Sequence, residues 1–126
     1  MSGVLTFGTT PSCLGVRRMA RNDLQGTLDL LVLKTLSQMG ELHGYGIVLH
    51  IQRASEELLT VEEGSLYPAL HRMEMSGWIR SEWKVTDTNR KAKYYRLTLA
   101  GQKELRKAEE SFEQLVQGIR AILRYA

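Results

Sequence analysis

The stretch that decides the fold reads Val61-Glu62-Glu63-Gly64-Ser65-Leu66-Tyr67-Pro68-Ala69-Leu70-His71-Arg72-Met73-Glu74-Met75-Ser76-Gly77-Trp78. Its apolar residues recur at helical spacing and predict a buried stripe along one helix, formed by Leu66, Ala69, Leu70 and Met73. Because a proline is tolerated only in the first turn of a helix, Pro68 places the start near residues 63 to 65, with Ser65 as the N-cap. Gly77 is expected to end the helix.

The opposite face of this helix lacks an apolar stripe. At about 100° per residue, the side chains expected to point away from the core are Gly64, Tyr67, Pro68, His71, Arg72 and Met75. The stretch alone fits an ordinary amphipathic core helix and a helix that offers one face to a partner about equally well. The segments before and after this helix distinguish between these two interpretations.

Two further helices are expected before this one, from Thr27 to Met39 and from Gly44 to about Leu58, with a short turn at Glu41-Leu42-His43. Thr27 is the expected N-cap of the first helix, which is apolar over most of its circumference and is therefore predicted to be buried on several sides. The second helix, a tight turn and the helix that contains Leu66 are what a helix-turn-helix requires.

A β-hairpin is predicted after the helix-turn-helix, with strands over Trp78–Thr86 and Ala92–Leu99 joined by the polar loop Asp87–Lys91. Trp78 and Trp83 are expected in the hairpin core, an interpretation favoured over a role in lining a ligand site. Residues 80–96 carry six basic side chains against two acidic ones, a concentration that the chain's modest net charge of +3 does not reveal. A hairpin with a basic tip in this position is a wing.

The last helix is expected from about Leu99 to Arg124, with Thr98 at its N-cap. Its apolar residues are spaced alternately by three and four positions and form an a/d seam of Leu105, Ala108, Phe112, Leu115, Ile119 and Ile122. Pairing of this seam with a second copy of the chain is favoured over folding back onto its own core.

These elements predict a mainly α fold with a small β-hairpin, an α+β winged helix-turn-helix that continues into a long C-terminal helix. The expected divisions are a poorly ordered N-terminal extension over residues 1–22, the winged helix-turn-helix over 23–99 and a dimerisation helix over 100–126. Met19 lies just before the first periodic segment and raises the hypothesis that the preceding residues are an extended start.

Enzymatic activity is not expected, because the sequence has no phosphate loop, nucleophile motif or metal-spaced cluster. No cofactor or metal is predicted. His43 is interpreted as a turn hydrogen-bonding residue and His50 as a surface residue.

Cys13 is the only cysteine, which excludes an internal disulfide and suits a reducing cytoplasm. No apolar run approaches the roughly 20 residues that a membrane span needs.

At this point the sequence resembles the PadR family of bacterial winged-helix transcriptional regulators. The matching segments occur in the family's order and are Gly26–Leu33, His43–Ile47, Gly64–Glu74, Gly77–Ile79 and Lys93–Gly101. The resemblance implies a dimeric repressor that binds a two-fold symmetric operator, and the single C-terminal helix is similar to the short form of the family.

The expected partners are therefore double-stranded DNA and a second copy of the chain, and a small-molecule inducer of unknown identity is left open. The predicted DNA-binding residues are Ser65, Tyr67, Pro68, His71 and Arg72 on the third helix and Arg90, Lys91 and Lys93 on the wing. The alternative is a winged-helix protein–protein interaction module without DNA binding, which has no need for so basic a wing.

Overall fold

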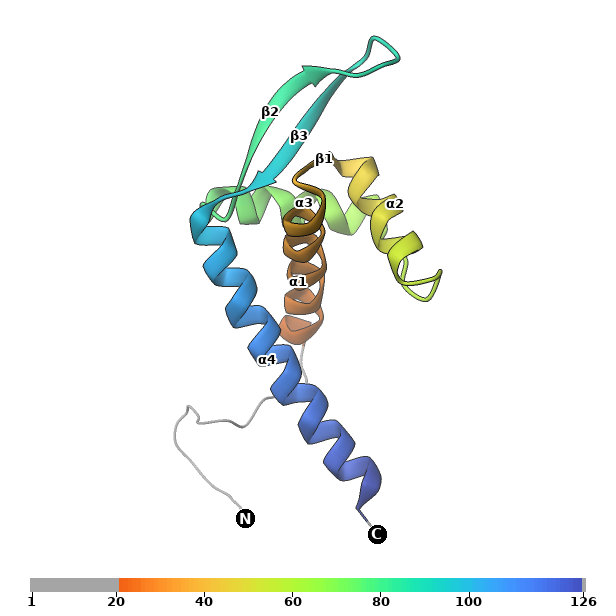
Figure 1. Ribbon diagram of the computed structural model, residues 1–126, viewed down its shortest axis with the longest axis vertical. Helices are drawn as coiled ribbons and strands as arrows, with labels where there is room; N and C mark the ends of the chain where they lie inside the picture. The colour runs from red at the N-terminus through yellow and green to blue at the C-terminus, as the bar shows by residue number, and fades with distance from the viewer. Residues whose placement is uncertain (1–20, 126) are drawn as a thin grey trace.

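The computed structural model describes residues 21–125. In chain order its elements are α1 (Arg21–Met39), β1 (Glu41–His43), α2 (Gly44–Ala54), α3 (Glu63–Met75), β2 (Ile79–Val85), β3 (Lys91–Leu97) and α4 (Leu99–Arg124). The β2–β3 hairpin projects from one end of the molecule, whereas α4 runs beside α1 toward the other end (Figure 1). The expected N-terminal extension falls almost entirely on residues 1–20, which lie outside the described part of the chain.

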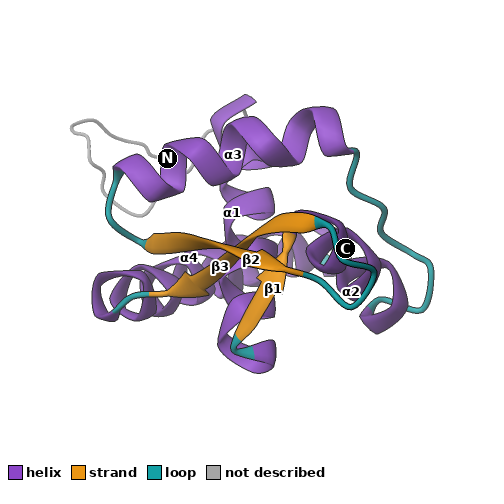
Figure 2. Cartoon of the chain, turned by 90° about the horizontal axis from the view of Figure 1, so that it is seen from above, coloured by secondary structure: helices purple, strands orange, loops and turns teal. Residues whose placement is uncertain are grey.

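The core forms where α1, α2 and α3 meet the base of the hairpin, and Figure 2 shows α3 lying along one side of the sheet. The predicted stripe of α3 is confirmed, because Leu66, Ala69, Leu70 and Met73 are all buried. Their partners in the core include Val32, Leu33 and Leu36 of α1, Ile47 and Ile51 of α2, and Ile79 and Tyr95 of the hairpin. Removal of these apolar surfaces from water anchors α3 by one face and leaves its other face free.

The bounds of α3 agree with the prediction, but its N-terminal details differ. Glu62 is the N-cap residue and makes no side-chain cap bond, so the prediction of Ser65 as the cap was wrong. Pro68 lies in the second turn and not in the first, and its ring nitrogen cannot donate to the carbonyl of Gly64. Gly64 and Pro68 are both exposed, so water can hydrogen-bond to the Gly64 carbonyl. The helix therefore continues past the proline.

The first helix is longer than the sequence predicted, and the second helix is shorter. α1 begins at Arg21, so Thr27 is an interior residue and not an N-cap. α2 ends at Ala54 and not near Leu58, because Glu56 and Glu57 adopt positive φ angles of 54° and 69° that break the helix. His43 caps α2 as a hydrogen-bonding residue, because its Nδ1 accepts a 3.0 Å bond from the backbone N–H of Gly46.

The sheet has a third strand that the sequence did not predict. Residues 41–43 were expected as a turn, but they form β1 and pair antiparallel with β3, which gives the strand order β1-β3-β2. Within the hairpin, Ile79 pairs with Leu97 and Trp83 pairs with Lys93. The prediction that Trp83 belongs to the hairpin core was wrong, because this side chain is 65% exposed. The hairpin extends beyond the helices that could cover it (Figure 1).

The final helix begins as predicted, because Thr98 Oγ1 accepts a 3.0 Å hydrogen bond from the N–H of Gly101. Leu105 is buried against the core, but the seam becomes progressively exposed beyond Leu115. Ile119 is 42% exposed and Ile122 is 75% exposed. Within one chain, the distal half of the α4 seam therefore has little to pack against.

Candidate nucleic-acid interface

The outer face of α3 presents several exposed polar and aromatic side chains. Ser65, Tyr67, Pro68 and His71 are all exposed, although each is next to or near a residue of the buried stripe. Their arrangement follows from the helical period, which turns these positions away from the core. Four of the five α3 residues named from the sequence therefore share one accessible surface.

Tyr67 is held in place by its contact with the start of α2. A Cβ added to Gly44 would lie 2.6 Å from the phenol oxygen of Tyr67 and 2.7 Å from ring atom Cε1, so only glycine leaves room for this ring. Partial burial, and to a lesser degree the Glu63 carboxylate, raise the pKa of the Tyr67 phenol above its ordinary value. The phenol therefore stays protonated at neutral pH and can donate a hydrogen bond from the exposed face of α3.

Replacement of Gly44 with Ala is expected to displace the Tyr67 ring without unfolding the protein. The added methyl group meets only the distal part of a flexible side chain, and the better helix propensity of Ala, up to about 1 kcal/mol, opposes the cost of moving it. The expected result is a changed Tyr67 resonance in spectra of ring-labelled tyrosine, with a melting temperature within about 5 °C of the parent. An unchanged Tyr67 resonance would contradict the contact.

Arg72 differs from the other α3 residues because its guanidinium group is engaged within the fold. Nη1 and Nη2 donate to the two carboxylate oxygens of Asp29 in α1, at 2.9 and 2.7 Å. These hydrogen bonds are the main cause of a raised pKa for Arg72. The paired bonds tie α3 to α1 across 43 positions of sequence. Base reading by Arg72 stays a prediction, and the observed contact is one that orients α3.

The basic residues of the hairpin fall into two groups. Lys84 and Arg96 both contact Glu41 of β1, at 2.7 and 3.5 Å, and Lys93 lies 3.5 Å from Glu74 of α3. The hydrogen bond from Lys84 is the main cause of a lowered pKa for Glu41. Among the side chains described, those of residues 26–125, no carboxylate oxygen lies within 4 Å of the charged nitrogens of Arg90 or Lys91 at the tip. Arg80, at the base of the hairpin, likewise has no such partner, so two of the three unpaired basic residues, Arg90 and Lys91, lie at the tip of the wing.

A groove of about 820 Å³ separates the wing from the helix-turn-helix. One wall comes from the start of α2 and from Tyr67, and the other comes from Trp83, Val85 and the basic residues of the hairpin tip. The groove brings together Tyr67, Arg90, Lys91 and Lys93 from the residues predicted from the sequence. Ser65, Pro68 and His71 lie outside its lining, on the exposed surface of α3.

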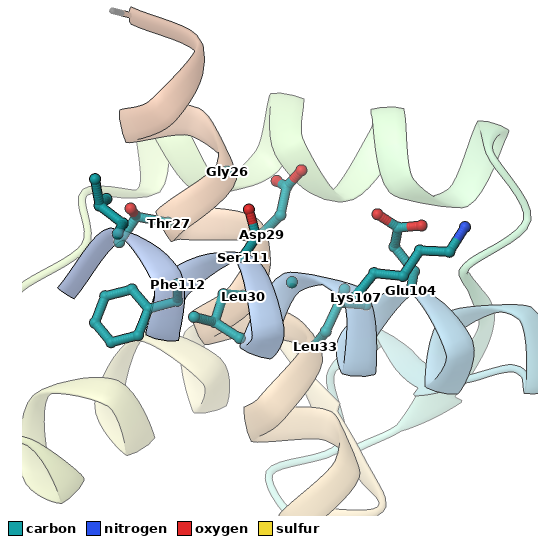
Figure 3. A pocket seen from close by; sticks show the side chains of 11 residues that line it. Gly26, Thr27, Asp29, Leu30, Leu33, Glu104, Lys107, Ser111 and Phe112 are labelled. Atoms are coloured by element: carbon teal, nitrogen blue, oxygen red, sulfur yellow. The ribbon is translucent and has the colours of Figure 1, made fainter. Parts of the chain in front are cut away.

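A second, smaller pocket of about 290 Å³ lies between α1 and α4 (Figure 3). Leu30, Leu33, Phe112 and Leu115 give it apolar walls, and Asp29 points from this pocket toward α3, where it meets Arg72. The volume is at the lower limit of about 300 Å³ for ordinary ligand pockets. The pocket also borders the exposed part of the α4 seam.

Several contributors to this surface were not found from the sequence. Glu41 lies in a three-residue strand that has no readable pattern, yet its carboxylate contacts two of the six basic residues of the hairpin, Lys84 and Arg96. Asp29 appeared as an ordinary polar residue of an apolar helix. Tyr45 is one of the apolar residues of α2, yet it lines the groove and is 56% exposed. Each role depends on a contact between segments far apart in the chain.

Other kinds of site are not seen in the described residues. The structure from residue 21 to residue 125 contains no group of three or more His, Cys, Asp or Glu side chains arranged to hold a metal ion. In the same part of the chain, no helix has the length and apolar character needed to cross a membrane.

A helix-turn-helix whose last helix exposes one face, followed by a hairpin beside that face, defines the winged helix-turn-helix class. Comparison with known proteins identifies the family within this class. Residues 32–107 match the model of the transcriptional regulator PadR-like family. The chain therefore belongs to the PadR-like family of transcriptional regulators, and it is a regulator and not an enzyme.

Individual relatives agree with this assignment. The transcriptional regulator Rv3488 of Mycobacterium tuberculosis is 35% identical over 79 residues, which cover 63% of this chain and 70% of the relative. A transcriptional regulator from Clostridium thermocellum has a similar structure, with a TM-score of 0.73, 29% identity and coverage of 82% of this chain and 99% of that chain. A PadR-like regulator from Bacillus cereus gives a TM-score of 0.68 at 28% identity, with 83% and 99% covered.

Proposed function

We propose that this regulator acts as a homodimeric repressor that binds a two-fold symmetric operator in double-stranded DNA. The exposed face of α3 enters the major groove, where Tyr67 and His71 reach base edges and Ser65 lies near the backbone. Arg90 and Lys91 at the wing tip contact neighbouring phosphates. Lys93 contributes less, because Glu74 already compensates part of its charge.

The observation that carries this proposal is the position of uncompensated charge beside the exposed face of α3. Lys84, Arg96 and Lys93 lie beside Glu41 or Glu74, whereas Arg90 and Lys91 at the wing tip extend past these carboxylates. Phosphate contacts supply affinity and orientation, and side chains on a helix in the major groove supply sequence preference. Tyr67 of α3 and the basic wing tip line the same groove, which supports this division of roles.

The second copy of the chain is assigned to the distal α4 seam. Phe112, Ile119, Ile122 and Leu123 are exposed in the single chain, and a contiguous apolar surface of this kind is unfavourable in water. A symmetric partner would cover this surface and the α1–α4 pocket beside it. Two copies would also present two α3 helices to DNA, as a two-fold operator requires. A small-molecule inducer stays a prediction without an assigned site.

Salt-dependent binding of duplex DNA tests this function. The double variant Arg90→Ala/Lys91→Ala is expected to bind all duplexes more weakly and to lower the slope of log affinity against log salt by about 0.9 for each phosphate that the wing no longer neutralises. A matched control removes two exposed basic residues from α4, Lys103→Ala/Arg106→Ala, and changes net charge equally. The control is expected to keep the parent slope.

Two outcomes would contradict the proposal. If the parent protein binds no duplex at low salt, the protein–protein interaction module becomes the better explanation. If both double variants lower the slope equally, net charge and not the wing position determines the affinity. Fluorescence anisotropy of a labelled duplex at four or more salt concentrations provides the measurement.

A further inference from the structure

Trp83 and Val85 extend the core-facing side of the hairpin beyond the core. Alternation along β2 places them on the same face as Ile79, and the register places Tyr95 on that face through its pairing with Ser81. At the base of the hairpin this face is buried, because Ile79 and Tyr95 contact the helices. Toward the tip the same face is open, and Trp83 is 65% exposed.

An exposed indole in the middle of a strand is not needed to hold this fold together. Most of the Trp83 surface remains in water, so its burial contributes little to folding. Across the groove, Tyr45 and Tyr67 are also about half exposed, so that aromatic side chains contribute to both walls. A groove with aromatic walls on a protein of this size indicates a surface that is covered by a partner.

The charges around the groove indicate the chemistry of that partner. The lining includes Arg90, Lys91 and Lys93 and only one carboxylate, that of Asp87. Apolar walls with a positively charged rim match a nucleic-acid strand, in which apolar faces of the sugars alternate with phosphate anions. An apolar peptide would leave the positive charges of Arg90 and Lys91 uncompensated.

We propose that Trp83 is a DNA-contact residue whose indole packs against the deoxyribose rings of the strand that runs between the wing and α3. Arg90 and Lys91 hold the phosphates on either side of this contact, and Val85 extends the apolar wall. This inference rests on the proposed binding of duplex DNA. In this arrangement the wing gains affinity for DNA from apolar contact between Trp83 and the sugars. This contribution is separate from the charge of the wing and does not depend on base sequence.

The test uses random-sequence 20-base-pair duplexes, fluorescein-labelled, with the full-length protein. Trp83→Ala is expected to weaken binding about tenfold, as removal of an aromatic side chain of this size implies. The salt slope is expected to stay at the parent value, because every phosphate keeps its basic partner. Trp83→Phe, which keeps an aromatic ring, is expected to recover most of the affinity. Leu58→Ala, which removes an exposed apolar side chain outside the groove lining, is the matched control and is expected to have no effect.

Intrinsic fluorescence provides a second readout that does not depend on the Ala variant folding. The chain has two tryptophans, so Trp83→Phe reports Trp78 alone, and its difference from the parent isolates the emission of Trp83. Addition of duplex is expected to quench the Trp83 emission and leave that of Trp78 nearly unchanged. The inference is overturned if duplex binds with parent affinity to Trp83→Ala and does not alter the Trp83 emission. That result leaves the proposed DNA binding intact, whereas failure of the parent to bind any duplex overturns both.

Discussion

Replacement of Ile119 with Asp is expected to convert the proposed homodimer into folded monomers. Ile119 is already 42% exposed in the single chain, so a carboxylate at this position stays hydrated and disturbs the winged helix little. In the proposed dimer the same carboxylate would be buried in the α4 seam, at a cost of several kcal/mol in each copy. Leu115 is a poorer choice for this test, because it also packs within its own chain beside α1.

Sedimentation equilibrium gives the mass, and far-ultraviolet circular dichroism gives the helical content. The matched control is Gln117→Asp, which places the same charge on the exposed side of α4 away from the seam and is expected to remain dimeric. A folded, dimeric Ile119→Asp protein would show that the exposed seam is not the contact between copies. Dissociation of the control to the same extent would assign the effect to charge on α4 in general.

Among the described glycines, Gly101 is the one whose replacement with Ala is expected to cause the largest loss of stability. A Cβ at this position would overlap the carbonyl oxygen of Trp78 and lie 2.8 Å from Cδ1 of Leu97. The overlap is with backbone, so α4 or the start of the wing would have to move. Thr98 fixes this junction, because its hydroxyl donates to the Gly77 carbonyl at 2.6 Å. The expected decrease in the free energy of unfolding is about 2 to 4 kcal/mol.

The matched control for this substitution is Gly64→Ala in α3. That glycine is also helical, but an added Cβ would meet no heavy atom within 4 Å. Without a clash, the change from Gly to Ala is expected to raise stability by up to about 1 kcal/mol. Chemical denaturation of both variants provides the comparison. A Gly101→Ala protein as stable as the parent would contradict the close packing of α4 against the residue before β2.

Much of this fold could be predicted because its main elements carry strong local patterns. Leu66, Leu70 and Met73 mark the buried face of α3 through their spacing alone, and Thr98 marks the start of α4 through its capping chemistry. The basic hairpin is readable because alternating residues flank a polar loop. These signals depend on neighbours in sequence, so they require no knowledge of the tertiary structure.

The features that escaped prediction depend on contacts between distant segments. Asp29 and Arg72 are separated by 43 positions, and nothing local indicates that the guanidinium group turns toward α1. β1 is only three residues long and is a strand because β3 lies beside it. Alternation assigned Trp83 to the correct face of the hairpin, but it could not show where the helices stop covering that face. The candidate interface is therefore predictable in outline, and its charge balance and aromatic wall are not.

The central claim is that the exposed face of α3 reads DNA sequence, and the ratio of two affinities tests it most directly. A preferred duplex is first selected from random DNA with the parent protein. Binding of that duplex and of a scrambled one is then compared for the parent, Tyr67→Ala and His71→Ala, with melting temperature as the control on folding. Removal of each side chain that reaches a base edge is expected to cost about 1–3 kcal/mol on the preferred duplex, doubled in a symmetric dimer, and much less on the scrambled one. If both folded variants keep the parent ratio of affinities, α3 does not read bases and the central claim is wrong.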